Sequence, residues 1–169
     1  MESREQFIRV IVADSQAVFR AGLRKIFAIE GDIRVVGQAE TLQQAITAAK
    51  KFSAEILIFE AALAENPVEA AREIFKQAPG LRLAVLTETP NEELTLELFR
   101  RGVHAIVSRE IDSEMFVECL RTIAKATQVL STALMPKRVS GCARWFMNTC
   151  SLGGRPSRWR SNQCSNHAG

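Results

Sequence analysis

Short apolar runs alternate with longer stretches of helical periodicity along roughly the first 125 residues of this chain. The runs are rich in Ile, Val and Leu, a composition typical of strands that are buried on both faces of a parallel sheet. We predict strands over 7–13, 33–36, 56–59, 83–86 and 105–107.

The stretches between these runs carry apolar residues three or four positions apart, which predicts amphipathic helices. Several begin at residues that can cap a helix: Ser15, Thr41, Asn66 and Asp112. The segment Thr89-Pro90-Asn91-Glu92 repeats the pattern with Thr89 at the cap position, and Gly102 suits a left-handed helix end. We therefore expect five helices, the last of them extending through residue 134.

Five strands in strict alternation with five helices indicate an α/β fold, with a parallel sheet covered by helices on both faces. Periodicity alone does not determine the order of the strands. We place this domain at residues 7–127 and a second segment at 128–169, where Gly, Ser, Arg, Trp and Cys replace the earlier background and no apolar period persists.

Four of the apolar runs lead into a polar side chain. Asp14, Glu60 and Thr87 follow three runs directly, and Arg109 follows a fourth after one serine. The carboxyl ends of parallel strands lie at the same edge of a sheet, and ligands bind there in open α/β folds. We therefore expect these four side chains to lie together as a functional site.

The formal net charge of +3 is unevenly distributed. Residues 136–169 carry +6, and the remainder carries −3. The acidic body gives no electrostatic reason to expect specific nucleic-acid binding, although the basic segment could hold nucleic acid loosely. Without a membrane-length apolar run or a signal-peptide core at the first residues, we expect a cytoplasmic protein with no membrane partner.

Two segments resemble the response-regulator receiver domain. Residues 8–16, Ile-Arg-Val-Ile-Val-Ala-Asp-Ser-Gln, are similar to that family's first strand and acidic turn, and 101–109 are similar to its fifth strand and basic residue. Residues 18–23, Val-Phe-Arg-Ala-Gly-Leu, resemble the subgroup normally followed by a LuxR-type helix-turn-helix. The resemblance implies a CheY-like, flavodoxin-like fold with strand order 2-1-3-4-5.

The resemblance also implies a phosphorylation site, from which this sequence departs. The position of the phospho-accepting Asp holds Glu60, the second Mg²⁺-binding acid is Ser15, and the conserved Lys position holds Arg109. Asp14 and Thr87 match the family, and the aromatic switch position holds Ile106. Asp14 and Glu60 remain as metal ligands, so we expect weak Mg²⁺ binding at best and no required cofactor.

The substitutions have a physical consequence. Glutamate reaches roughly 1.5 Å further than aspartate, toward where a phosphoryl group would sit. Arginine binds a carboxylate in a two-pronged fashion that lysine cannot adopt. We therefore predict a pseudo-receiver, in which Glu60, Thr87 and Arg109 form a standing network that partly mimics the phosphorylated state.

We interpret the chain as a signalling module rather than an enzyme. The expected partners are a sensor histidine kinase or another signalling protein, and a second copy, on the face of the fourth helix, fifth strand and fifth helix around Leu96, Arg100 and Met115. One alternative is a truncated or frame-shifted DNA-binding regulator. A flavodoxin-like enzyme is disfavoured, because the turn after the first strand lacks a phosphate cradle and Asp14 would repel a flavin phosphate.

Overall fold

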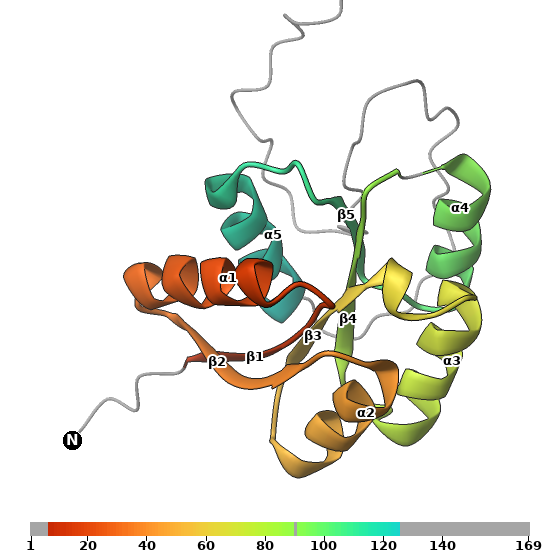
Figure 1. Cartoon of the computed structure of the whole chain (residues 1–169), viewed down its shortest axis with the longest axis horizontal. Coiled ribbons are helices and arrows are strands. Elements are labelled where there is room, and N and C mark those ends of the chain that lie inside the picture. The colour runs from red at the N-terminus through yellow and green to blue at the C-terminus, as the bar shows by residue number, and fades with distance from the viewer. Residues whose placement is uncertain (1–6, 90, 126–169) are drawn as a thin grey trace, which may run out of the picture.

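The computed structural model describes residues 7–89 and 91–125. Figure 1 shows a central sheet flanked by helices. The strands are β1 (Ile8–Ala13), β2 (Ile33–Ala39), β3 (Ile56–Glu60), β4 (Arg82–Thr87) and β5 (Ala105–Ser108). The helices are α1 (Ala17–Glu30), α2 (Leu42–Lys51), α3 (Pro67–Gln77), α4 (Glu92–Arg100) and α5 (Ser113–Lys125), with a 3-10 turn, η1 (Ala61–Leu63), after β3.

All neighbouring strands are parallel, in the order β2-β1-β3-β4-β5. This confirms the flavodoxin-like order that the family resemblance implied. The alternation of strands and helices confirms the α/β class, and the reversal of strand order places β1 beside β3 at the centre of the sheet. In folds of this kind, sites form outside the carboxyl ends of the strands at that reversal.

Alternate residues of the strands enter two separate cores. Ile56 and Ile58 of β3 pack with α1 and α5 on one face, whereas Leu57 and Phe59 pack with α2, α3 and α4 on the other. Figure 1 shows α1 and α5 on one side of the sheet and the other three helices opposite. Each fully buried aliphatic or aromatic side chain of this size contributes about 1.5–3 kcal/mol, so burial on both faces holds the strand ends in register.

Most of the predicted helix ends are present. Thr41 and Asn66 accept hydrogen bonds from backbone N–H groups in the first turns of α2 and α3. Helix α4 is capped by Asn91, which accepts from the Leu94 N–H, and not by the predicted Thr89. Gly31 and Gly102 have φ of 77° and 92°, the left-handed conformation that favours glycine after a helix.

Two other local predictions were wrong. Ser15 does not cap α1, because Gln16 is the N-cap residue and the Ser15 side chain bonds to Glu60 instead. Strand β2 does not end at Val36 but continues to Ala39, with a register irregularity opposite Val10 and Ile11. At Gly37 a Cβ would lie 3.0 Å from the ring of Phe52, so a side chain there would require the ring to shift by a few tenths of an ångström.

Arg121 of α5 ties the amino-terminal edge of the sheet to the end of α1. Its Nε and Nη2 lie 2.8 Å and 2.9 Å from the two carboxylate oxygens of Asp32, and Nη2 also lies 2.9 Å from Glu30 Oε2. The hydrogen bond from Arg121 lowers the pKa of Asp32 below 3.8. A lowered pKa means that the charged carboxylate stabilises the folded state above that value and loses this effect as the pH falls through the folded pKa.

We therefore expect Asp32→Asn to lower the free energy of unfolding by up to about 1 kcal/mol near pH 7, an amount typical of a partly exposed pair. The difference from wild type should shrink as the pH falls below 3.8, where the unfolded wild type binds the proton first, and should vanish below the lowered folded-state pKa, where Asp32 is protonated in both states. Urea unfolding across this range measures it, with Glu69→Gln, from the exposed pair with Arg72, as control. If Asp32→Asn were less stable than the wild type by the same free energy near pH 7 and well below pH 3.8, the ion pair would not be the cause.

Among residues 7–89 and 91–125, no helix is long and apolar enough to cross a membrane. The predicted segment 128–169 and the extension of the last helix to residue 134 lie outside the described residues.

Candidate functional site at the carboxyl edge of the sheet

The four polar residues predicted at the strand ends all lie at the carboxyl edge of the sheet. Asp14 follows β1, Glu60 and Thr87 are the last residues of β3 and β4, and Arg109 follows β5. Asp14, Glu60 and Thr87 are buried, with 0%, 4% and 8% of their surface exposed. Burial of two carboxylates at one place requires a compensating charge nearby.

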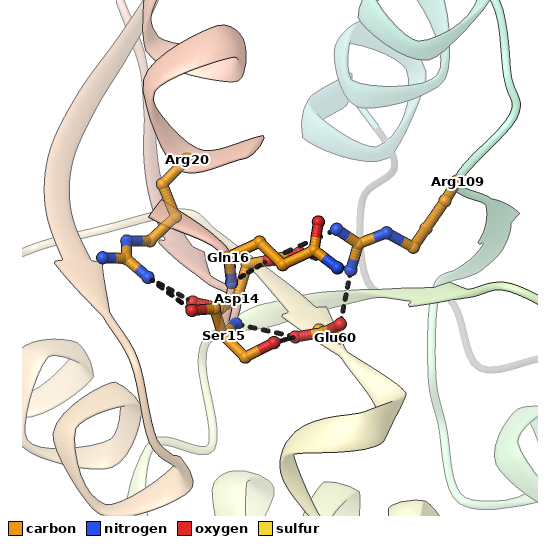
Figure 2. A network of polar contacts seen from close by, with 6 residues as sticks. All are labelled: Asp14, Ser15, Gln16, Arg20, Glu60 and Arg109. Atoms are coloured by element: carbon orange, nitrogen blue, oxygen red, sulfur yellow. Dashed lines mark hydrogen bonds and ion pairs between the residues drawn. The ribbon is translucent and has the colours of Figure 1, made fainter. Parts of the chain in front are cut away.

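Arg109 supplies that charge by reaching between the two carboxylates, as Figure 2 shows. Its Nη1 lies 2.8 Å from Asp14 Oδ2 and 2.5 Å from Glu60 Oε1, and its Nη2 lies 3.3 Å from Asp14 Oδ1. The Arg109 side chain is 9% exposed, so water screens these contacts little. Arg109 thus joins the ends of three strands into one ionic cluster.

Ser15 occupies the other oxygen of Glu60. The Ser15 backbone N–H and its hydroxyl donate hydrogen bonds of 2.7 Å and 2.8 Å to Glu60 Oε2. Gln16 donates its backbone N–H to Asp14 Oδ1 at 2.8 Å. All four oxygens of the two carboxylates therefore accept hydrogen bonds from this chain.

Arg20, on the first turns of α1, fixes the turn that contains Asp14 and Ser15. Its Nη1 donates hydrogen bonds to the backbone oxygens of Asp14 and Ser15, at 2.6 Å and 3.3 Å (Figure 2), and its Nη2 pairs with the carboxylate of Glu40. Because Arg20 is 7% exposed, it acts as an internal brace rather than a surface cation.

Phe19 covers Arg109 on a further side. The guanidinium carbon lies 4.1 Å from the centre of the Phe19 ring, a cation–π contact. The guanidinium therefore contacts both an aromatic face and two carboxylates.

The pKa of Asp14 is raised because its carboxylate is buried beside a second one. Burial is the largest cause that raises its pKa above 3.8, and the neighbouring charge of Glu60 raises it further. The hydrogen bond from Gln16 and the contact with Arg109 oppose this shift. The carboxylate pair is thus an unfavourable arrangement that the chain's own donors and its arginine offset.

Comparison with known proteins identifies the architecture. None of the protein-family models searched matches the chain. The transcriptional regulatory protein DegU of Brevibacillus brevis is 23% identical over 122 residues, and the transcriptional regulatory protein YhcZ of Bacillus subtilis is 28% identical over 130 residues. A LuxR-family two-component response regulator from Aurantimonas sp. SI85-9A1 superposes with a TM-score of 0.65 at 20% identity, over 70% of this chain and 85% of that one. The chain is a relative of the response regulators, with the fold of their receiver domain.

The similarity to DegU and YhcZ covers 72% and 76% of this chain. The chain spans only 52% and 60% of the length of these two relatives. The comparisons therefore concern the receiver domain, and they confirm the CheY-like fold and the LuxR-type relationship that the sequence motifs indicated.

The structure places the remaining predicted residues of this receiver domain as follows. The carbonyl oxygen of Thr87 accepts the backbone N–H of Arg109 at 3.1 Å, but the Thr87 hydroxyl neither donates to Glu60 nor accepts from the Arg109 guanidinium. The contacts of Arg109 run to Asp14 instead, so the network differs from the predicted trio of Glu60, Thr87 and Arg109. Ile106 is buried in β5 on the face packed against α2, α3 and α4, 6% exposed.

With Arg109 in place, the residues of this site do not fit the Mg²⁺ ion that the receiver fold implies. Mg²⁺ requires oxygen ligands in near-octahedral geometry. Here the inward oxygens of Asp14 and Glu60 both face the same guanidinium nitrogen, and the position of a further acid holds Ser15. No group of three or more His, Cys, Asp or Glu residues in the described ranges could hold a metal ion.

Sequence reasoning missed the roles of Phe19 and Arg20. Both residues enter the sequence analysis only as members of segment 18–23, with no role in the site. A signal was present for Arg20, because it lies three and seven residues before Leu23 and Phe27, on the buried stripe of α1. An arginine on such a stripe needs a buried partner, and the acidic turn is the nearest candidate.

Proposed function

We propose that this chain is a pseudo-receiver in two-component signal transduction and transcription regulation, acting by protein–protein contact without being phosphorylated. The observation that carries the proposal is the state of Glu60. It stands where the family resemblance places the phospho-accepting Asp, and both of its oxygens are engaged by Ser15 and Arg109. A carboxylate held in this way is a poor nucleophile toward a phosphodonor, and the pocket lacks the usual metal ligands that would lower the barrier.

The geometry supports partial mimicry of the phosphorylated state. Glu60 places a negative charge beyond the reach of an aspartate and pairs it with the basic residue that follows β5. The mimicry is partial because a phosphoryl group carries about −1.5 to −2 charge and three acceptor oxygens.

The proposed partners are a sensor histidine kinase or another signalling protein in the cytoplasm. The proposed contact surface is the face of α4, β5 and α5, where Arg100 is exposed and Leu96 and Met115 are half-buried. Pairing of two copies through the same face follows from the same proposal. The proposal includes no cofactor, no catalytic activity and no specific nucleic-acid binding by this chain.

Incubation of the full chain with acetyl phosphate and Mg²⁺, read by intact mass, tests the proposal. We expect no stable phosphoryl addition to the wild type. A variant with Ser15→Asp, Glu60→Asp and Arg109→Lys, which restores the family's residues, is the matched positive control. Stable addition of one phosphoryl group to wild-type Glu60 would overturn the proposal.

A further inference from the structure

The acidic pocket already contains a cation of its own. Nη1 of Arg109 lies within hydrogen-bonding distance of one inward oxygen of Asp14 and one of Glu60. We infer that the Arg109 guanidinium is the permanent counter-ion of this pocket, and that it keeps divalent cations out of a site which would bind them if the arginine were removed. The inference deepens the proposed function and rests on it, because it explains how the state of the site is fixed.

The first argument concerns the oxygen atoms. Glu60 Oε1 and Asp14 Oδ2 accept from Arg109, Glu60 Oε2 accepts from Ser15, and Asp14 Oδ1 accepts from the Gln16 N–H. A divalent ion would need at least two of these oxygens, and it could take them only by displacing the guanidinium. Hence metal and Arg109 compete for the same ligands.

The second argument concerns access. The side chains of Asp14, Glu60 and Arg109 are 0%, 5% and 9% exposed. Phe19 stacks on the guanidinium, so displacement of Arg109 also breaks the ring contact. An entering hydrated ion would have to lose water while the arginine gave up two ion pairs and a stacking partner.

The third argument concerns charge. Without Arg109, Asp14 and Glu60 would form a buried pair of like charges, a state that strongly favours uptake of a cation. The hydroxyl of Ser15 lies beside Glu60 and supplies a third oxygen. The set of two carboxylates and a hydroxyl suits a hard cation such as Mg²⁺ or Mn²⁺. The pocket is therefore a latent metal site that the arginine fills.

The test compares the wild-type chain with Arg109→Ala, which removes the charge and opens space beside the carboxylates. Binding of Mn²⁺ is measured by electron paramagnetic resonance, and thermal melting is compared in EDTA and in Mg²⁺ at matched ionic strength. We expect the melting temperature of the wild type to be the same in EDTA and in Mg²⁺, and that of Arg109→Ala to be higher in Mg²⁺ than in EDTA. The affinity of Arg109→Ala for Mn²⁺ should be at least about tenfold above that of the wild type.

Arg72→Ala is the control, because it removes a positive charge from an exposed pair on α3, away from the pocket. If Arg109→Ala does not fold, Arg109→Gln takes its place in the same comparison. Wild-type binding as tight as that of the variant, or a folded variant that gains no affinity, would overturn the inference. A variant that gains no affinity would leave the proposed function standing. Phosphorylation of the wild type would instead overturn the proposed function.

Discussion

Replacing Arg109 with methionine is expected to lower the free energy of unfolding by about 3–5 kcal/mol, the usual effect of breaking a buried ion pair from one side. Methionine fills much of the volume but leaves Asp14 and Glu60 without the cation that lies 2.8 Å and 2.5 Å from them. Urea unfolding followed by circular dichroism in metal-free buffer measures the loss.

Two further variants show whether charge is the cause. Arg72→Met removes an exposed guanidinium, 66% accessible, and should change stability by no more than about 0.5 kcal/mol. Combining Arg109→Met with Asp14→Asn and Glu60→Gln removes all three charges and should recover most of the loss, because neutral replacements avoid the uncompensated carboxylates. A loss below about 1 kcal/mol for Arg109→Met would mean that the cluster is not a strong ionic contact.

Shortening Glu60 to aspartate is expected to lower the free energy of unfolding by about 1.5–3 kcal/mol, the contribution of a hydrogen bond to a charged group. The carboxylate would retreat by roughly 1.5 Å and could not reach both Ser15 and Arg109. In the wild type these contacts lie on opposite oxygens, at 2.8 Å and 2.5 Å. Urea unfolding of Glu60→Asp, again in metal-free buffer, measures the change.

The matched control for length is Glu97→Asp on the exposed surface of α4, where only a few tenths of a kcal/mol of helix propensity should be lost. Because Arg109 still fills the pocket, Glu60→Asp alone should not acquire tight Mg²⁺ binding. An aspartate variant as stable as the wild type would show that the extra methylene of Glu60 has no role in holding the cluster.

The fold could be predicted from the sequence because the strands are buried on both faces. Runs such as 56–59 have no polar face, and their alternation with capped helices leaves few topologies open. The strand order came from the family resemblance and not from periodicity. The extension of β2 through Gly37 was missed, because glycine is unfavourable in an isolated strand and the ring of Phe52 that packs beside it comes from another part of the sequence.

The site could be predicted only as far as the strand ends determine it. Asp14, Glu60 and Arg109 follow buried strands, so their convergence follows from a parallel sheet. Which oxygen pairs with which donor depends on side-chain rotamers and on the turn after β1. That is why the bond from Ser15 to Glu60 and the stacking of Phe19 on Arg109 appear only in three dimensions.

A double-mutant cycle between Glu60 and Arg109 tests the central claim most directly. The wild type, Glu60→Gln, Arg109→Met and the double variant are unfolded with urea in EDTA, so that no divalent cation can replace the arginine. The account predicts an interaction energy between the two side chains of about 1.5 kcal/mol or more. An interaction energy within about 0.5 kcal/mol of zero would contradict the claim that Arg109 is the standing counter-ion of Glu60.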